Sequence, residues 1–496
     1  MSFAQKGCGM EYVVEPEKRV PVVYDVDVCV AGAGVSGVFA AIAAARNGAR
    51  TVVIDRFGSV GGNVGPGMIV NGQMLPGSPH PDVPFTKTVY PGLFGLAEEF
   101  INRYAALGGG LLQPFTKGAN FSRGASVASY LLQEMLEESG ASILLSTFVA
   151  DPIKEGDRVC GVFVENKSGR AAVRAKVVID ATGEADVARR AGAPILLPKN
   201  EYTAIDGHAP TGMGTYYVVG GIAWDRFRSA QKGNEATEDD IAWGTKTIGA
   251  ALTKAHSYVL PYLRKAVEAG EYEPVAKVMI NGKSISVQGG GVGQFEGNEL
   301  GHGQVQVERT EEVDAGDGLH MSALGAAVQA YAFEKVQFFS RYVPGFENAY
   351  LITVAPFLGS RGGPCIEGEY TLTMEDCVAG RRFDDVIYLY GEFRALRKTA
   401  EAGAPKWVDV PYRVLVPQGV DGLLATGRSA SGVPDTLLRN RLAVKVMGEA
   451  CGIAASMCAA KGVEPRKLEV RELQNALLDA GFYLGDRARL KELSLT

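Results

Sequence analysis

The segment from residue 27 to residue 55 constrains the fold more than any other part of the chain. A valine-rich run at 27–31, an alanine-rich run at 35–47 and a β-branched run at 51–54 predict a strand, a helix and a strand. These elements form one βαβ unit, which requires parallel strands in a sheet that is covered on both faces.

Three glycines with the spacing GxGxxG lie between the first strand and the helix, and this context predicts a dinucleotide site. Gly32 permits a tight turn, Gly34 lets the backbone approach a diphosphate, and Gly37 lets the helix pack closely on the sheet. The backbone amides of Val35 and Ser36 open the helix, where unpaired N–H groups and a partial positive charge favour phosphate.

The residues that follow favour FAD over NAD. Asp55 ends the second strand, where a carboxylate accepts hydrogen bonds from ribose hydroxyls, and Arg56 follows it. A second glycine cluster, GSVGGNVGPG at 58–67, comes next and resembles the second glycine-rich stretch of FAD-binding proteins of the glutathione-reductase type. Relatives with covalent FAD attach it to a histidine near this cluster, whereas this cluster has none, so we expect non-covalent FAD. The predicted contacts here are Gly61, Gly62 and Asn63.

The segment at 144–194 extends the same resemblance. It predicts a short strand, a three-stranded meander with turns at 154–158 and 166–170, and a strand that ends in Ala181-Thr182-Gly183. The resemblance implies that the backbone near Val149 meets the adenine. It also places the turn formed by Ala181, Thr182 and Gly183 beside the cofactor.

The C-terminal segment at 408–462 resembles the last FAD-contacting segment of FAD-dependent oxidoreductases, which are relatives of fumarate reductase and succinate dehydrogenase flavoproteins. It predicts a strand at 422–425, a turn at Gly427 and Arg428, and a helix from about residue 442 to 460. The family usually reads Gly-x-Ala-Ala-Gly in this helix, and this chain reads GEACG at 448–452. The resemblance places the helix N-terminus near the reduced flavin ring, together with Arg439 and Arg441.

These segments cover about half of the chain and predict an α/β protein. Its Rossmann-type FAD-binding domain has a parallel sheet plus a three-stranded meander, and an α+β substrate domain is inserted into it. The glycine-rich stretch at 286–303 lacks a following helix pattern, so we expect no second nucleotide domain. The expected divisions are an extension at 1–24, the FAD-binding domain at 25–200 and 347–470, a substrate-binding cap at 201–346 and a tail at 471–496.

The chemistry expected of such a protein needs a proton-transfer group and a substrate anchor. His208 and His302 lie in glycine-flanked segments of the expected cap and are the predicted proton-transfer residues, with a plain loop role as the alternative for each. Tyr216 and Tyr217 are further candidates. Arg361 lies in GSRGGP at 359–364, where relatives often read Gly-x-Arg-Glu-x-Arg. It is predicted to hold a carboxylate, a carbonyl or a flavin oxygen, or else to pair with an internal acid.

We therefore predict an enzyme that moves a hydride between flavin N5 and a small organic substrate at a CH–OH or a CH–CH bond. One alternative is a non-redox flavoprotein isomerase or hydratase. Another is a flavin monooxygenase, although those usually read Gly-Asp where this chain has Gly427-Arg428. A third is an electron-transfer subunit, which no cysteine cluster supports.

Composition excludes several other classes. The net charge is −6 and the basic residues are dispersed, so no nucleic-acid partner is expected. The seven cysteines are scattered without a C-x-x-C pair, so we predict no metal site. The chain has neither an apolar leader nor an uncharged apolar run of membrane-spanning length, which predicts a cytoplasmic protein without a membrane partner. Homo-oligomerisation is expected from base rates alone.

Overall fold

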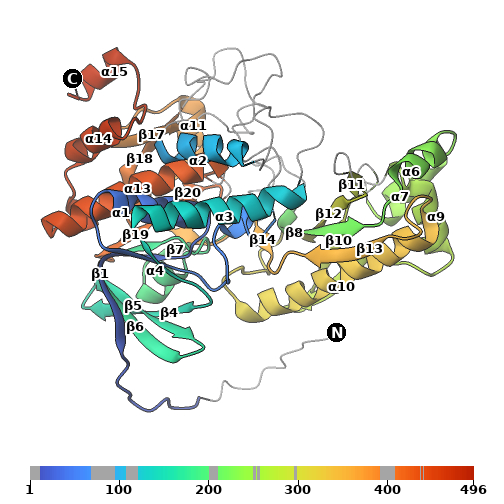
Figure 1. Cartoon of the computed structure of the whole chain (residues 1–496), viewed down its shortest axis with the longest axis horizontal. Helices are drawn as coiled ribbons and strands as arrows, with labels where there is room; N and C mark the ends of the chain where they lie inside the picture. The colour runs from blue at the N-terminus through green and yellow to red at the C-terminus, as the bar shows by residue number, and fades with distance from the viewer. Residues whose placement is uncertain are drawn as a thin grey trace.

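The computed structural model describes residues 12–68, 95–107, 121–199, 201, 211–249, 253, 257–294, 299–390, 408–435, 437–438 and 441–495. Two bodies lie side by side (Figure 1), and each has helices packed on one seven-stranded sheet. This is the α/β architecture that the sequence predicts. The larger body contains the first strand and the last helix of the described chain, and the smaller body is inserted between them.

The large sheet has the strand order β3-β2-β1-β6-β5-β4, and β19 pairs with β6. Its parallel part consists of β1 (Val22–Ala31), β2 (Thr51–Ile54), β3 (Ser142–Leu144), β6 (Gly169–Asp180) and β19 (Leu423–Ala425). The first strand begins earlier than the predicted residue 27, because its N-terminal half continues beside β6 with Val22 opposite Ala172.

The predicted meander is confirmed, with one difference. Strand β4 (Phe148–Glu155), β5 (Arg158–Asn166) and β6 form consecutive antiparallel pairs. The strand predicted to follow the meander is not a separate element, because β6 is 12 residues long and continues from the meander into the parallel part of the sheet.

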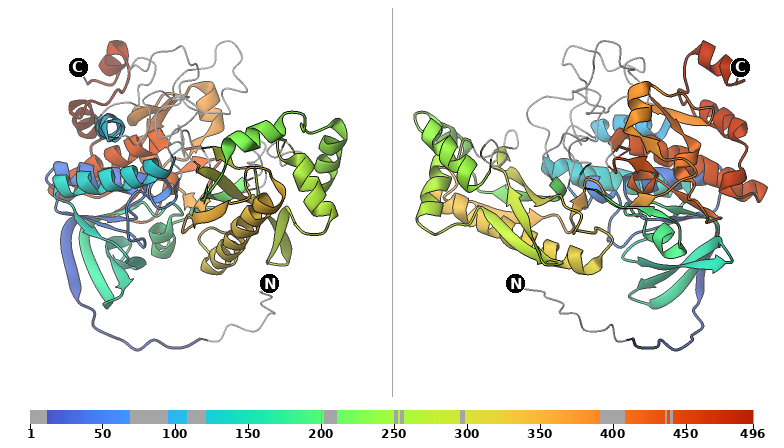
Figure 2. Two further views of the ribbon diagram at one scale, coloured as in Figure 1. Left: turned by 45° about the vertical axis from the view of Figure 1, so that its right-hand side comes forward. Right: turned by 180° about the vertical axis from the view of Figure 1, so that it is seen from behind.

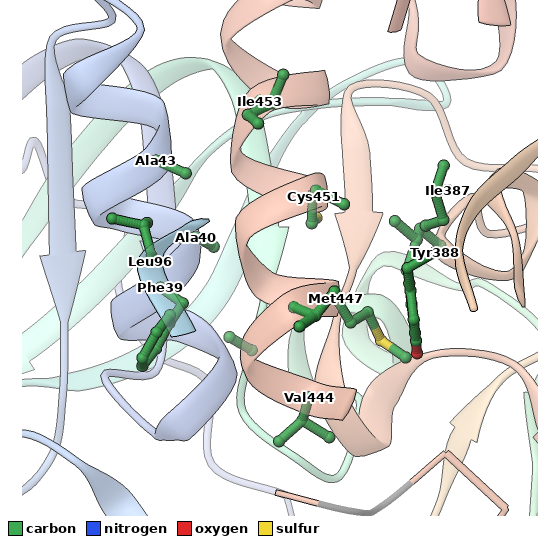
Figure 3. Close-up of a cluster of buried hydrophobic side chains, with 14 of the residues drawn as sticks. Phe39, Ala40, Ala43, Leu96, Ile387, Tyr388, Val444, Met447, Cys451 and Ile453 are labelled. Atoms are coloured by element: carbon green, nitrogen blue, oxygen red, sulfur yellow. The ribbon is translucent and has the colours of Figure 1, made fainter. Parts of the chain in front are cut away.

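Two helices that are far apart in sequence pack against each other on this sheet. They are α1 (Val35–Arg46) and α13 (Arg441–Lys461), which Figure 3 shows side by side. A Cβ atom at Gly448 would lie 2.2 Å from the carbonyl oxygen of Ser36, and one at Gly452 would lie 2.1 Å from that of Ala40. The predicted helix with small residues is thus confirmed, and its glycines bring the two backbones into contact.

Helix α13 is also the one described helix that is long and apolar enough to cross a membrane by length and composition, over Ala443–Lys461. The protein itself buries 89% of that window, as expected of a core helix. Glu449 on this helix accepts a hydrogen bond from the backbone N–H of Leu96 at 3.1 Å. It therefore caps α2 (Gly95–Ala106), which packs beside α3 (Phe121–Ser139). Burial raises the pKa of Glu449 to about 8.

The smaller body has an antiparallel sheet with the order β13-β8-β12-β10-β9. Its strands are β8 (Thr211–Gly220), β9 (Val275–Ile280), β10 (Lys283–Gly289), β11 (Gly293–Gln294), β12 (Gly301–Glu308), β13 (Tyr350–Val354) and β14 (Gly359–Ser360). The long helix α10 (Gly318–Tyr342) packs on one face (Figure 2). Helices α6 (Trp224–Gln231), α7 (Glu238–Thr247) and α9 (Leu260–Glu268) complete this body.

Two expected boundaries differ from the structure. The boundary at 346 comes too early, because β13 and β14 both pair with β8 in the small sheet. The segment at 471–496 is more than a tail, because α14 (Val470–Asp479) and α15 (Arg487–Glu492) belong to the large body. Leu473 and Leu493 are fully buried in its core.

Short elements complete the description. They are η1 (Gly62–Val64), α4 (Asp186–Ala191), β7 (Ile195–Leu196), β15 (Cys365–Ile366), β16 (Leu372–Thr373), α11 (Met374–Ala379), β17 (Val386–Tyr390), β18 (Val408–Pro411), η3 (Tyr412–Leu415), η4 (Gly427–Ser429), β20 (Gly432–Val433) and η5 (Pro465–Lys467).

Candidate functional site

The carboxyl ends of β1, β2, β6 and β19 meet at one edge of the large sheet, which is where open α/β sheets bind ligands. Backbone hydrogen bonds join the loops that leave these strands. The N–H of Gly32 donates to the carbonyl of Ile54 at 2.8 Å, and that of Ala181 donates to Ala31 at 2.8 Å. The predicted glycine turn, the Ala-Thr-Gly turn and the Gly-Arg turn therefore share one edge.

The first turn has the backbone geometry that the three glycines predict. Gly32 has φ = +103°, and a Cβ atom there would lie 2.5 Å from the carbonyl oxygen of Ala181. A Cβ atom at Gly37 would lie 1.9 Å from the carbonyl oxygen of Gly32. Gly34 differs, because no atom of the described residues lies within 4 Å of its Cβ position. A side chain at Gly34 would therefore enter open space at the N-terminus of α1.

The N-terminus of α1 has no side-chain cap among the residues that the structure describes. Its first residues, Val35 and Ser36, therefore present backbone N–H groups that the helix itself cannot pair. The Ser36 hydroxyl is used elsewhere, in a 2.7 Å hydrogen bond with the hydroxyl of Thr426. An anion at this position would receive N–H donors and the positive end of the helix dipole.

Asp55 stabilises the first turn through hydrogen bonds to backbone N–H groups. Its Oδ2 accepts a hydrogen bond from the N–H of Ala33 at 2.7 Å, and its Oδ1 accepts one from the N–H of Phe57 at 2.9 Å. Burial raises the pKa of Asp55, and these two hydrogen bonds act in the opposite direction. Each oxygen retains a second lone pair, so the predicted hydrogen bonds to ribose are compatible with this geometry. Beside it, the Arg56 guanidinium lies 5.0 Å from the centroid of the Phe57 ring.

The second glycine cluster packs directly on the first. Gly61 has φ = +106° and donates its N–H to the carbonyl of Ala33 at 2.8 Å. A Cβ atom at Gly62 would lie 2.8 Å from the Cα atom of Gly34. Next to them, the buried Oδ1 of Asn63 accepts no hydrogen bond from any described residue. A buried amide oxygen of this kind is a candidate acceptor for a bound polar group.

Hydrogen bonds hold the Ala-Thr-Gly turn against the end of β19. The Oγ of Ser429 accepts from the N–H groups of Gly183 and Ala185, both at 3.1 Å. The fully buried Asp180 accepts from the N–H of Thr182 at 3.1 Å and from that of Ala188 at 2.9 Å, and burial raises its pKa. The turn therefore has a defined position.

Arg428 lies between two glycines at the junction of the two bodies. A Cβ atom at Gly183 would lie 2.9 Å from its Nη2, and one at Gly363 would lie 3.1 Å from its Nη1. Its Nη2 donates to Glu184, which also accepts from the Oγ of Ser360 at 2.9 Å. The buried Nη1 donates to no acceptor among the described residues. Arg428 thus has a donor available beside the Ala-Thr-Gly turn.

Glu184 and Ser360, which link β14 of the small body to this turn, were not among the predicted site residues. The sequence did contain a signal for Glu184. This acid directly follows Ala-Thr-Gly, so it lies at the same edge of the sheet as the predicted turn with Arg428. Asp186, two residues later, was also missed. Burial raises its pKa to about 7, and the charges of Glu184 and Asp180 act in the same direction.

The other predicted residues lie as follows. His302 and Arg361 both adjoin β8: His302 is opposite Val218, and the N–H of Arg361 donates to the carbonyl of Gly212 at 2.9 Å. The carbonyl of Val149 accepts a hydrogen bond from Arg190 at 3.1 Å. His208 and Arg439 lie outside the described residues, and Arg441 is described only as the first residue of α13.

The two tyrosines lie on opposite faces of β8. Tyr217 is fully buried in the core of the small body, and burial raises its pKa well above the ordinary value, which makes it a poor candidate for proton transfer. The ring of Tyr216 stacks beside that of His302, with 6.3 Å between centroids. Burial lowers the pKa of His302 to about 4, so His302 is neutral at pH 7.

This pKa predicts an acid-sensitive contribution of His302 to stability. Between about pH 6.5, the pKa expected in the unfolded chain, and pH 4, the unfolded state binds a proton that the folded state does not. Stability therefore falls as the pH falls through this window. Through His302, the unmodified protein should lose about 2 kcal/mol of unfolding free energy between pH 8 and pH 5. The His302→Gln variant should lack this loss, and urea unfolding of both proteins measures the difference. Equal losses in the two proteins would contradict a lowered pKa.

Comparisons with known proteins add the following findings. A family model described as FAD dependent oxidoreductase matches residues 27–477. Thiamine thiazole synthases from Pyrobaculum arsenaticum and Pyrobaculum islandicum are 34% and 33% identical over 182 and 171 residues. These alignments cover 34% and 32% of this chain, and 60% and 56% of the relatives. The chain thus spans less than two thirds of the length of these curated relatives.

Two solved structures align over most of the chain. A geranylgeranyl bacteriochlorophyll reductase-like protein from Thermoplasma acidophilum has a TM-score of 0.39 at 13% identity, with coverage of 95% of this chain and 99% of that chain. The p-nitrophenol 4-monooxygenase from Pseudomonas putida DLL-E4 has a TM-score of 0.40 at 13% identity, with coverage of 95% and 92%. The family match confirms the predicted cofactor, FAD, and the predicted FAD-binding fold. Non-covalent attachment stays a prediction.

Proposed function

Because the chain belongs to the FAD dependent oxidoreductase family, we propose that it transfers a hydride between flavin N5 and a carbon atom of a small organic substrate. The bond that changes is a CH–OH or a CH–CH bond. The observation that carries the cofactor placement is the open space at Gly34, in front of a helix N-terminus that no described side chain caps.

The residues at the sheet edge fit FAD. The amides of Val35 and Ser36 would bind its diphosphate, and Asp55 its adenosine ribose. The buried Oδ1 of Asn63 would accept a hydrogen bond from a hydroxyl or N–H group of the cofactor, since it accepts none from the described residues. When bound, FAD supplies two-electron redox chemistry through its flavin ring.

Arg428 is the proposed cationic partner of the cofactor. Its Nη1 is buried and retains donors, while Glu184 and the two flanking glycines orient the guanidinium. The backbone segments proposed to line the cofactor are those at Gly61 and Gly62, at Val149, at Ala181 to Gly183, and at Gly427.

His302 is the proposed proton acceptor. It is neutral at pH 7. Its strand, β12, pairs with β8, and β8 pairs with β14. Ser360 of β14 donates a hydrogen bond to Glu184, which lies beside Arg428. His208 is the alternative proton-transfer residue. Arg361, in the loop that follows β14, is proposed to orient the substrate.

Anaerobic mixing tests the reaction type. The purified protein should absorb near 450 nm, and its true substrate should bleach this absorbance without oxygen. Deuterium at the reacting carbon should slow the bleaching, because the C–H bond breaks in that step. Turnover without bleaching would instead indicate an isomerase or a hydratase. Incorporation of an oxygen atom from O2 into the product, without anaerobic bleaching by the substrate, would indicate a monooxygenase.

A further inference from the structure

One face of the small sheet carries a continuous set of uncharged polar side chains, which we call the neutral face. Direct cross-strand partners point to the same side of a sheet, as do residues two positions apart on one strand. Gln304 is opposite Tyr216, and Gln306 is opposite Gln288. The neutral face consists of Tyr216, Gln288, His302, Gln304 and Gln306. The apolar Val218, opposite His302, and Glu308, at the end of β12, lie on the same side of the sheet.

The other face of the same sheet is the hydrophobic core of the small body. Val287, Val305, Val307 and Tyr217 are all fully buried there, and α10 covers them. Along β12, buried residues alternate with half-buried ones, and the half-buried set includes His302, Gln304 and Gln306. Core packing therefore does not explain why amide side chains occupy the neutral face.

The side chains of the neutral face form one surface. The Nε2 of Gln306 donates to the Oε1 of Gln304 at 3.1 Å. A Cβ atom at Gly214, on the adjacent strand, would lie 3.1 Å from the Nε2 of Gln304, so this amide lies against the glycine. The rings of the buried Tyr216 and the half-buried His302 lie at 28° to each other beside these amides. The surface thus combines flat rings with amide donors and acceptors.

The charged groups at the border of the neutral face are engaged with protein partners. The carboxylate of Glu308 accepts from the N–H of Ser286 at 3.1 Å, and Lys277 donates to the Ser286 hydroxyl at 3.3 Å. Arg309, which follows β12, forms a buried ion pair with Asp435. A substrate carboxylate prefers a guanidinium or an ammonium group, and the five residues of the neutral face provide neither. Arg361, whose N–H donates to Gly212 of β8, is the guanidinium proposed near the substrate, and we assign it to a carbonyl or hydroxyl oxygen.

We infer that the neutral face binds the substrate of the proposed reaction and that this substrate is an uncharged polyhydroxylated compound, a sugar or a polyol. Each glutamine amide both donates and accepts, which matches hydroxyl groups, and the rings offer a flat surface to the C–H face of a sugar. The inference rests on the proposed function, because it names the substrate class of that same site.

The chemistry balances for one turnover. The substrate carbon loses its hydrogen as a hydride to flavin N5, and the hydroxyl on that carbon loses its proton to His302 or to water. A C=O bond forms, so the alcohol is oxidised while FAD, the oxidant, is reduced by two electrons.

Matched ligand pairs test the substrate class. The FAD-loaded protein is titrated without oxygen with glucose, galactose, myo-inositol and mannitol, and with gluconate and galacturonate as carboxylate counterparts, while the flavin spectrum is recorded. We expect at least one neutral compound to perturb or bleach the flavin at concentrations at least tenfold lower than either carboxylate. Equal or tighter binding of the carboxylates, or no response to any neutral compound, overturns the inference.

Charge variants locate the site on the neutral face. Gln304→Glu and Gln306→Glu keep the side-chain size and add a charge, so each should raise the KM for the neutral substrate at least tenfold. Gln329→Glu, the same change at an exposed position on α10, should leave the KM unchanged. An unchanged KM in both face variants overturns the inference, and if one variant fails to fold, the other decides.

The two proposals fail in different ways. A protein that binds FAD and is reduced only by a charged substrate retains the proposed function and refutes the neutral substrate class. A protein that catalyses turnover of a sugar without flavin bleaching refutes hydride transfer and retains the substrate class.

Discussion

A Gly34→Leu variant is expected to fold normally and to bind FAD at least about 100-fold more weakly, which corresponds to about 2.7 kcal/mol. Gly34 has φ = −72° and ψ = −174°, an extended conformation that leucine adopts without strain. No described atom lies within 4 Å of its Cβ position, so the new side chain meets no described protein atom. It instead occupies the space proposed for the diphosphate, in front of α1.

Flavin absorbance after desalting, and titration of the apoprotein with FAD, measure this loss. Gly325→Leu is the matched control, because its Cβ position is equally open but lies on α10 of the small body. Both variants should retain the far-UV circular dichroism of the unmodified protein. Undiminished FAD affinity in Gly34→Leu would refute the placement of the diphosphate.

Gly452→Ala is expected to destabilise the protein by about 1–3 kcal/mol, although alanine is the better helix former. Its Cβ atom would lie 2.1 Å from the carbonyl oxygen of Ala40, so α1 and α13 must move apart. Residues of both helices, such as Phe39 and Met447, belong to the buried cluster in Figure 3 and would lose contacts.

Urea unfolding with absorbance and fluorescence measures this loss, with Gly325→Ala as the control. Both glycines lie inside helices, but the Gly325 site is open. Gly325→Ala should therefore stabilise the protein by up to about 1 kcal/mol. The two substitutions thus have opposite expected signs. A stabilising effect of Gly452→Ala would show that the contact between the helices is looser than described.

Much of the large body was predictable because its signals are local. The run of strand, glycine turn, helix and strand at 22–54 lies within one contiguous segment, where hydrophobic period and glycine spacing report directly on backbone geometry. The meander was predictable for the same reason, since its turns contain Gly156 and Gly169, both with positive φ. The boundary at 346 was wrong because β13 belongs to the small sheet. It pairs there with β8, which lies more than 100 residues earlier in the chain.

The βαβ unit, the glycine turn, the meander and the class of cofactor were predictable, because each depends on residues that are close together in the chain. The side chains that meet at the junction of the two bodies and on the small sheet were visible only in the folded protein. Arg428 and Glu184 are 244 positions apart in the chain. The position of His302 is set by the pairing of β12 with β8, in which His302 is opposite Val218. Contacts across such separations depend on the packing of whole domains, and local periodicity carries no information about them.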